Sequence, residues 1–182
     1  MHFDSTSFDG LTIFTPRVFS DSRGYFFESY NQQVLQNAGF NFNWVQDNQS
    51  HSSYGVIRGL HFQKNPSAQT KLVRVLQGEI LDVVVDLRKE QSTYGQVFSI
   101  ILSSENKQQL LIPKGFAHGF SVLSETADVM YKCDSLYDKQ SESGICYNDM
   151  SLAIDWKVPA EKIIVSEKDI ILSSFANCDA GF

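Results

Sequence analysis

Short runs of β-branched and aromatic residues alternate along this chain with breaks of Gly, Pro, Asn and Ser. From residue 11 onward the runs are LTIFTPRVF, YFFESY, VIRGLHFQ, KLVRVLQ, EILDVVVDL, QVFSIIL, QQLLIP and HGFSVLS. Such residues favour strands, and the intervening breaks mark turns. The pattern therefore predicts a protein that is mostly β.

The run over 79–87 shows how two faces of one strand differ. Because side chains alternate along a strand, one face is apolar and the other mixed. The apolar face carries Leu81, Val83, Val85 and Leu87, and the mixed face carries Ile80, Asp82, Val84 and Asp86. The two acids are either supporting groups of a site or surface residues at an edge, and we assign them no role.

Two tight turns and one helix complete the pattern. Gln77-Gly78-Glu79 joins two strand runs closely enough for a hairpin, and Pro113-Lys114-Gly115 makes a second turn before a strand that begins near His118. We therefore expect consecutive strands to pair antiparallel. Only NQQVLQNAG, over 31–39, predicts a helix, and it ends in a glycine suited to a C-terminal cap.

Many short strands in 182 residues favour one domain over residues 1–182. The expected fold class is mainly β: a jelly roll or β-barrel of antiparallel strands with a few short helices. Closure hides strand edges, and the mouth of such a barrel can hold a small ligand.

Composition and charge exclude several classes of protein. No apolar run reaches the roughly 18 to 20 residues that span a bilayer, and the first ten residues carry acids where a secretion signal carries Lys or Arg. We expect a cytoplasmic protein without a membrane segment. A net charge of −6 without a basic run argues against nucleic acid as a partner. Three cysteines without C-x-x-C spacing favour neither a disulfide framework nor a zinc site.

The stretch QDNQSHSSYGVIRGLHFQKNPSAQTK, over 46–71, concentrates amide, guanidinium, imidazole and ammonium groups. His61 lies in a predicted strand, and Arg58 points to the opposite face unless Gly59 bends that strand. Lys71 opens the next run and lies beside His61 if the two runs pair. A hydrogen-bonded structural histidine and a solvated lysine are the ordinary alternatives.

Further candidates lie outside this stretch. His118 follows a turn in IPKGFAHGF, a loop-to-strand junction of the kind that often contacts ligands. Tyr131 shares a strand face with Val129 and Cys133, which suits either a core tyrosine or a buried proton donor. DSRGYFFE contains Arg23 and Glu28 around an aromatic patch, and an exposed turn with an edge strand explains it equally well.

A metal site is not expected. Metal-binding barrels of the cupin type often use His-x-His, where this sequence has His61-Phe62-Gln63. His2 and His51 lie in poorly patterned segments, so a three-histidine site would need distant residues to converge.

Several short motifs, taken in their order along the chain, resemble those of one protein family. They are DSRGYFFE, QDNQS, GVIRGLHFQ, AQTKLV, IPKGFAHGF, Y-x-x-x-x-x-Y, ESGI and SEKD. In sequence and spacing the chain resembles the dTDP-4-dehydrorhamnose 3,5-epimerase family from Gly10 to Asp169.

The resemblance implies a cupin-type homodimer and an isomerase that needs no cofactor. Such enzymes epimerise C3 and C5 of dTDP-4-dehydro-6-deoxyglucose to give dTDP-4-dehydro-L-rhamnose, in the biosynthesis of dTDP-rhamnose and so of polysaccharide and lipopolysaccharide. It also implies that an N-terminal strand crosses to the partner subunit, where Arg23 and Glu28 serve the neighbouring pocket.

The resemblance further implies roles for individual residues. His61 is the base and Asp169 orients it, Lys71 stabilises the enolate oxygen, and Tyr131 returns a proton to the opposite face of the sugar. Implied substrate contacts are Arg23 and Arg58 at the diphosphate, His118 beside Lys71, Tyr137 in the nucleotide or sugar pocket, and Gln46, Asn48, Glu28, Glu142 and Lys168.

Three other functions share parts of this pattern. An epimerase acting at C3 alone would keep the same His, Asp, Lys and Tyr. A non-catalytic sugar-nucleotide-binding cupin would keep the binding residues, but the joint presence of His61, Tyr131 and Asp169 argues against it. A metal-dependent cupin is the third. For residues 170–182, the sequence assigns no role and leaves open whether they do more than cover the barrel.

Overall fold

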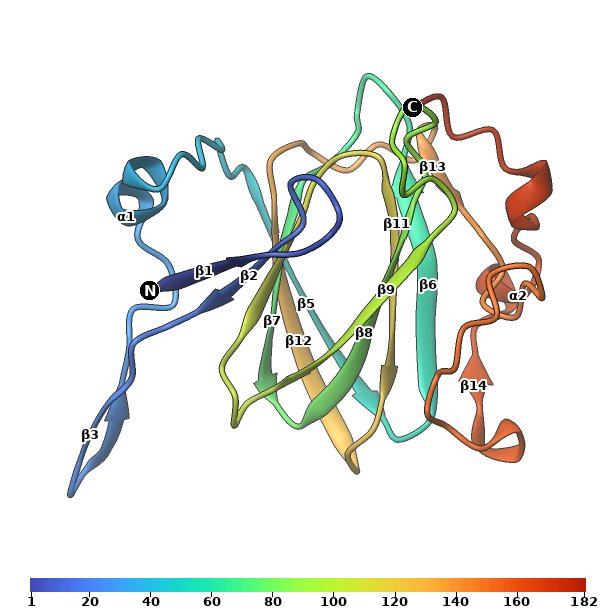
Figure 1. Ribbon diagram of the computed structural model, residues 1–182. Coiled ribbons are helices and arrows are strands. Elements are labelled where there is room, and N and C mark those ends of the chain that lie inside the picture. Colours follow the sequence, from blue (N-terminus) through green and yellow to red (C-terminus); the bar gives the residue numbers. More distant parts are fainter.

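The computed structural model describes residues 1–182 and consists mainly of two sheets that face each other (Figure 1). In spatial order, the first sheet contains β1 (His2–Ser5), β2 (Thr12–Thr15), β10 (Gln109–Ile112), β7 (Lys71–Gln77), β12 (Thr126–Cys133) and β5 (Gln46–Ser53). The second contains β13 (Glu142–Gly144), β6 (Val56–Gln63), β11 (Phe116–Val122), β8 (Glu79–Asp86) and β9 (Val97–Ser103). The predicted mainly β class is confirmed.

The smaller elements lie around these sheets. They are the hairpin β3 (Phe19–Asp21) and β4 (Gly24–Phe26), the helices α1 (Gln32–Asn37) and α2 (Glu167–Ile170), the strand β14 (Ile164–Val165), and 3₁₀ turns at Ala160–Lys162 and Phe175–Asn177. β14 runs parallel to the start of β6, whereas all other pairings are antiparallel between named strands. No helix is long and apolar enough to cross a membrane.

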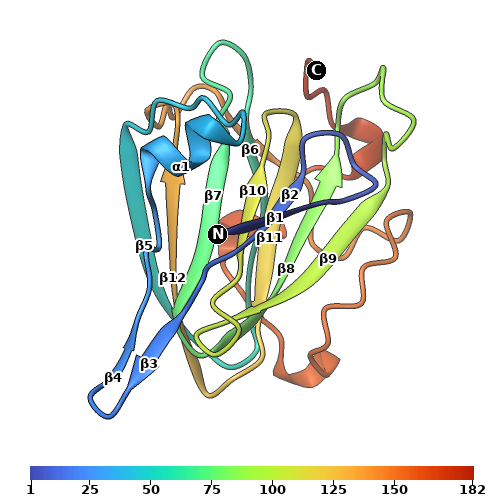
Figure 2. The ribbon, with the colours of Figure 1, turned by 60° about the vertical axis from the view of Figure 1, so that its left-hand side comes forward.

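The prediction that consecutive strands pair is wrong at both tight turns. The turn at Gly78 leads from β7 in the first sheet to β8 in the second, and the turn before β11 makes the same change from β10. Consecutive strands do pair antiparallel in β1–β2 and β8–β9, but the other pairings within the two sheets join strands distant in sequence, such as β5 with β12 and β6 with β11 (Figure 2). The His61 and Lys71 runs do not pair, because β6 and β7 lie in opposite sheets, so the condition under which Lys71 would lie beside His61 in one sheet is not met.

The main core fills the space between the sheets. It contains Val73, Val75, Ile80, Val84, Leu110, Phe120 and Val129, with Phe8 from the turn before β2. The other face of β8, with Leu81, Val83 and Val85, packs under the C-terminal segment around Leu152, Trp156 and Ala180. Both faces of β8 are thus buried. Asp82 and Asp86 are fully buried, so surface positions at an edge are ruled out for them.

The outer face of the first sheet is covered by the segment that contains α1. Leu35 of this helix packs against Phe14 and Leu72. The helix begins as predicted, because the side chain of its N-cap residue Asn31 accepts two backbone N–H groups. Gly39, at φ 91°, follows its end as the predicted cap requires.

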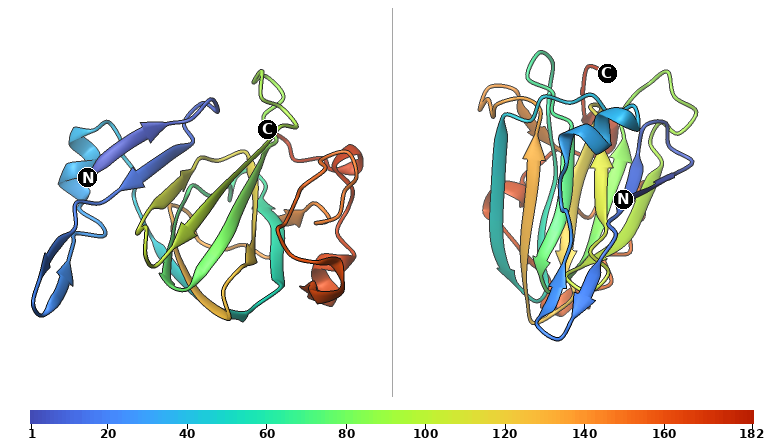
Figure 3. Two further views of the ribbon diagram at one scale, coloured as in Figure 1. Left: turned by 60° about the horizontal axis from the view of Figure 1, so that its bottom comes forward. Right: turned by 90° about the vertical axis from the view of Figure 1, so that its left-hand side faces the viewer.

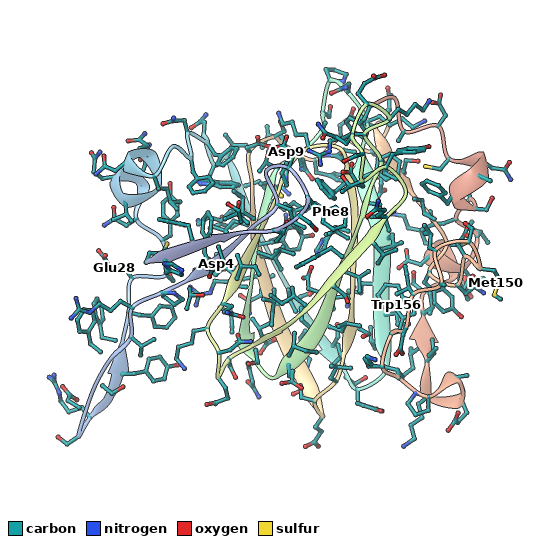
Figure 4. The ribbon with its side chains drawn as sticks, viewed as in Figure 1. Asp4, Phe8, Asp9, Glu28, Met150 and Trp156 are labelled. Atoms are coloured by element: carbon teal, nitrogen blue, oxygen red, sulfur yellow. The ribbon has the colours of Figure 1, made fainter.

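The hairpin β3–β4 projects away from both sheets (Figures 1 and 3). Phe19, Tyr25 and Phe26 are exposed on it, an unusual number of aromatic rings for so short a segment. Glu28, which follows the hairpin, lies on the side of the molecule opposite Trp156 and Met150 (Figure 4). The N-terminal and C-terminal segments therefore flank the barrel from opposite sides.

Candidate active site

A cavity of about 580 Å³ lies between the two sheets. Its walls come from β6 and β11 on one side and from β7 and β12 on the other, with α2 and the segment leading to β13 at the rim. It is lined by nine of the predicted site residues: Arg58, His61, Lys71, His118, Tyr131, Tyr137, Glu142, Lys168 and Asp169.

A β-bulge in β6 allows two of these side chains to enter the cavity together. Opposite β11, His61 pairs with His118 and Arg58 pairs with Phe120, so β6 has one residue more than its partner between these points. Gly59 sits at the bulge with φ 125°, where an added Cβ would lie 2.6 Å from Gly119 Cα. The bend that Arg58 required at Gly59 is therefore present.

His61 and Asp169 form a close pair. His61 Nε2 lies 2.7 Å from Asp169 Oδ1, and the N–H of Gly59 donates to Oδ2 at 3.3 Å. Burial acts to raise the pKa of Asp169, but the hydrogen bonds from His61 and Gly59 outweigh it and hold this pKa below its ordinary value. An ionised carboxylate only accepts, so Nε2 carries the hydrogen and neutral His61 keeps a lone pair on Nδ1.

Local structure explains why Asp169 reaches this point. β14 docks alongside Val56 and Ile57 of β6, which brings the following residues to the same strand. Ser166 then caps α2, and its hydroxyl accepts the N–H of Asp169 at 3.2 Å. The motif SEKD is thus a capped helical turn that directs its last carboxylate toward the bulge.

Lys71 and Tyr131 lie on the opposite wall, on adjacent strands. Lys71 Nζ is 5.7 Å from the centre of the Tyr131 ring. Burial lowers the pKa of Lys71, and the nearby Cys133, Asp82 and Glu142 oppose it only in part. Burial raises the pKa of Tyr131, so its phenol keeps its proton at neutral pH. No ion pair of the protein involves Lys71.

His118 forms a second histidine–carboxylate pair. Its Nε2 lies 3.1 Å from both oxygens of Asp82, although its N–H is directed at Oδ2 and Oδ1 has no hydrogen-bond partner. Burial lowers the pKa of His118, against the attraction of Asp82, and favours the neutral ring. Asp82 had no assigned role in the sequence-based prediction, and the structure makes it the partner of His118. The sequence signal that could have indicated this role is that Asp82 is an acid on the same strand face as the apolar residues Ile80 and Val84.

The rim of the cavity is held by a hydrogen-bonded chain. Tyr137 donates its hydroxyl to Glu142 Oε2 at 2.8 Å, and Lys168 Nζ donates to Glu142 Oε1 at 2.6 Å. Burial acts to raise the pKa of Glu142, but the bonds from Lys168 and Tyr137 lower it overall. Glu142 therefore links the segment after β12 to α2.

Arg58 is oriented by β5. Its Nε donates to Ser52 Oγ at 3.0 Å, and Nη2 makes a longer bond of 3.4 Å to the carbonyl of His51. No carboxylate forms an ion pair with it. The guanidinium is thus available to an anion in the cavity. Ser52 carried no signal in the sequence, because its contact with Arg58 depends on how the chain returns from β5 to β6.

Four predicted site residues do not line the cavity of their own chain. Asn48 pairs with Tyr131 in register and its Nδ2 lies 3.7 Å from Cys133 Sγ, while Gln46 Oε1 accepts the N–H of Tyr137. Arg23 lies at the tip of the β3–β4 hairpin and pairs with Asp21, and Glu28 accepts from Asn31. Cavity residues that the sequence did not single out as site residues are Gln49, Ser50, Val56, Ile57, Phe62, Gln63, Gln69, Gly119, Phe120, Ile164, Val165 and Ser166.

No group of three or more His, Cys, Asp or Glu side chains is placed to hold a metal ion. The arrangement offers instead a carboxylate-oriented imidazole facing a phenol and an ammonium group. These are the groups needed to remove a proton on one side of a ligand, stabilise negative charge, and return a proton on the other side.

Comparison with known proteins places the chain in a family. The family model for dTDP-4-dehydrorhamnose 3,5-epimerase matches residues 5–177. The chain belongs to the dTDP-4-dehydrorhamnose 3,5-epimerase family. A member from Shigella flexneri is 47% identical over 180 residues, covering 98% of both chains. The predicted resemblance and isomerase class are confirmed.

Solved structures agree with this assignment. The Bacillus anthracis dTDP-4-dehydrorhamnose 3,5-epimerase, with TDP and pyrophosphate bound, is 50% identical with a TM-score of 0.92 over 95% of this chain and 98% of that one. The Legionella pneumophila dTDP-6-deoxy-D-glucose-3,5-epimerase in complex with dTDP-4-keto-L-rhamnose is 46% identical, with a TM-score of 0.93 over 98% of this chain and 95% of that one.

Proposed function

We propose that this protein epimerises C3 and C5 of dTDP-4-dehydro-6-deoxyglucose without a cofactor, giving dTDP-4-dehydro-L-rhamnose. The observation that carries the proposal is the placement of the His61–Asp169 pair on one wall of a cavity and of Lys71 and Tyr131 on the other. The substrate follows from the family and from the 47% identical relative that bears this activity in its name.

The first step removes a proton next to the C4 ketone. His61 Nδ1 takes the proton from the carbon, and the electron pair of the C–H bond moves into the carbonyl to form an enolate. Asp169 stabilises the resulting imidazolium through Nε2–H. Lys71 stabilises the enolate oxygen, because a fixed ammonium group is most effective where negative charge develops away from water.

The second step returns a proton to the opposite face of the ring. Tyr131 gives its phenolic proton to the carbon, the enolate collapses to the ketone, and the configuration at that carbon is inverted. Proton exchange with solvent then restores Tyr131 and neutral His61. Both C3 and C5 are adjacent to the same ketone, so one set of groups serves both inversions once the sugar is repositioned.

The nucleotide part occupies the rim in this proposal. The free fork of Arg58 binds diphosphate oxygens in bidentate geometry, and Tyr137, Glu142 and Lys168 contact the remainder. His118 lies beside the sugar. The roles of Gln46 and Asn48 as substrate contacts stay predictions.

We further propose that the active form is a cytoplasmic homodimer in which the β3–β4 hairpin brings Arg23 and Glu28 to the partner's cavity. The exposed rings of Phe19 and Phe26 on this hairpin support it. Mixing inactive Arg23→Ala and His61→Ala chains should restore activity, since about one quarter of sites become intact in a random mixture of dimers. Failure to complement, with subunit exchange verified, would contradict the shared site.

Deuterium uptake tests the reaction itself. In deuterium oxide, with the 4-keto sugar nucleotide made in place, proton NMR should show exchange at both C3 and C5. Exchange at C3 alone would identify a C3 epimerase, and tight dTDP binding without exchange would identify a binding module. Activity lost on chelation and restored by a transition metal would favour the metal-dependent alternative.

A further inference from the structure

The four residues 135–138 form an exposed segment of the cavity rim that is nevertheless firmly held. Leu136 is 66% exposed and Tyr137 is 51% exposed. An apolar residue and an aromatic residue this exposed on a connection between strands are ordinarily free to change conformation. Here, each of the four residues makes one backbone hydrogen bond to a glutamine side chain. The first two accept through their carbonyls, and the last two donate through their N–H groups.

Three glutamines make these bonds, and we refer to Gln46, Gln63 and Gln69 as the glutamine clamp. Gln69 Nε2 donates to the carbonyl of Ser135 at 2.8 Å. Gln63 Nε2 donates to the carbonyl of Leu136 at 3.4 Å, and Gln63 Oε1 accepts the N–H of Asp138 at 2.7 Å. Gln46 Oε1 accepts the N–H of Tyr137 at 2.9 Å.

The clamp draws on both sheets. Gln46 begins β5 in the first sheet, Gln63 ends β6 in the second, and Gln69 precedes β7. Gln63 is only 5% exposed, and its Nε2 also donates to the carbonyl of Ser67 at 3.2 Å. Gln63 therefore attaches the residues on either side of Tyr137 to β6, the strand that carries His61.

Glutamine is suited to this task by its amide. One end donates and the other accepts, so a single uncharged side chain can satisfy both a carbonyl and an N–H of a passing backbone. Glutamate at position 63 would lose the donors and add a charge opposite Glu142, its register partner on β13. Leucine would fill similar space but leave buried polar groups unpaired.

We propose that the glutamine clamp is a positioning device that fixes Tyr137 at the cavity rim, with its hydroxyl on Glu142, and thereby sets the affinity for the nucleotide-sugar. This inference rests on the proposed function in taking Tyr137 as a ligand contact. A segment ordered before binding does not lose conformational entropy when the ligand arrives, so a clamped rim binds more tightly than a free one. The clamp acts on binding and leaves the groups that move protons untouched.

Amide hydrogen exchange in the ligand-free protein tests the clamp without reference to any reaction. The amides of Tyr137 and Asp138 should exchange slowly despite the exposure of the segment. Gln46→Leu should speed exchange at Tyr137 by at least about tenfold, whereas Gln46→Glu keeps an acceptor and should preserve protection. Fast exchange at both amides in the wild type would overturn the clamp, whatever the enzyme catalyses.

Steady-state kinetics then test its consequence. Gln63→Leu should raise KM about tenfold, with kcat changed by less than about twofold. Gln96→Leu is the matched control, because Gln96 makes the same kind of bond, to the carbonyl of Ser92 at 3.1 Å, on a loop outside the cavity. It should leave both constants unchanged. A fall in kcat with unchanged KM for Gln63→Leu would contradict the proposal.

A double-mutant cycle separates positioning from direct contact, since Gln63 itself lines the cavity. In a Tyr137→Ala background, Gln63→Leu should have no further effect on KM, because its target is already gone. A further tenfold rise would mean that Gln63 touches the ligand directly, and would overturn the positioning role. If the wild type proves inactive on the proposed substrate, the exchange measurements still decide whether the clamp exists.

Discussion

Two histidine–carboxylate pairs lie side by side in this protein and differ mainly in exposure. His61 and His118 are direct partners on β6 and β11, and each points Nε2 at an aspartate. The side chain of His61 is 32% exposed and that of Asp169 is 5% exposed. The corresponding values for His118 and Asp82 are 6% and 0%. Both histidines line the cavity, but one pair is partly exposed there and the other is buried.

In the proposed mechanism, the more exposed pair supplies the base and the other pair is a buried support. His61 faces the open cavity and is paired with the carboxylate of Asp169. His118 also borders the cavity, but its side chain is buried, and this burial lowers its pKa against the attraction of Asp82. With Nε2 of neutral His118 donating to Asp82, its Nδ1 is an acceptor, so the proposed mechanism assigns donation to the enolate oxygen to Lys71. We therefore propose that exposure, more than residue type, decides the role of each pair.

The largest effect is expected from the carboxylate of the exposed pair. Asp169→Asn should lower kcat by about 10² to 10³-fold, because the amide no longer enforces the Nε2–H tautomer or stabilises the imidazolium. Thermal unfolding should show a fold that is still intact. Activity within tenfold of wild type would remove Asp169 from the mechanism and erase the distinction between the pairs.

Tyr131→Phe should separate abstraction from reprotonation. Product formation should fall by about 10²-fold, while deuterium uptake at C3 and C5 falls less, because His61 still removes the proton and can return a deuteron to the same face. The measurement compares uptake with product in one NMR time course. If the two decline in parallel, Tyr131 is not the acid that acts opposite His61.

The alkaline limb of the pH–rate profile should belong to Lys71. Burial lowers its pKa and raises that of Tyr131, and both shifts favour loss of the ammonium proton before the phenol proton as pH increases. Above the lowered pKa, kcat should fall by about tenfold per pH unit. Lys71→Arg, which stays charged, should move this limb to higher pH even if the maximal rate is reduced. An unmoved limb would assign it to another group.

The smallest effect on catalysis is expected from the buried pair. Asp82→Asn should reduce kcat by less than tenfold but lower the free energy of unfolding by about 1 to 3 kcal/mol, through a weakened buried hydrogen bond. Urea unfolding with parallel kinetics gives both values. A loss of activity as large as that of Asp169→Asn, without loss of stability, would make the buried pair catalytic.

Local features of the fold followed from the sequence, and long-range pairing did not. Alternating residues predicted the strands, and Gly39 correctly predicted where α1 ends. The turn at Gly78 misled, because a tight glycine turn serves a hairpin and a crossing between sheets equally well. Contacts with distant residues decide between a hairpin and a crossing. One such contact is with Thr126, whose carbonyl oxygen would lie only 2.1 Å from a Cβ added to Gly78.

Site residues that belong to the family's sequence motifs could be predicted, and those outside the motifs could not. His61, Lys71, Tyr131 and Asp169 were found through the family resemblance, and the cavity brings them together. Asp82 was left without a role, since alternation gives a face but not what that face meets. The glutamine clamp left no local signal because its bonds join residues up to 91 positions apart.

The contrast between the two histidines is tested most directly by replacing each with asparagine. Under identical conditions, His61→Asn should slow deuterium incorporation at C3 and C5 by at least about 10²-fold while dTDP still binds, and His118→Asn should keep incorporation within tenfold of wild type. If His118→Asn stops incorporation and His61→Asn does not, the exposed pair is not the base and the account is wrong.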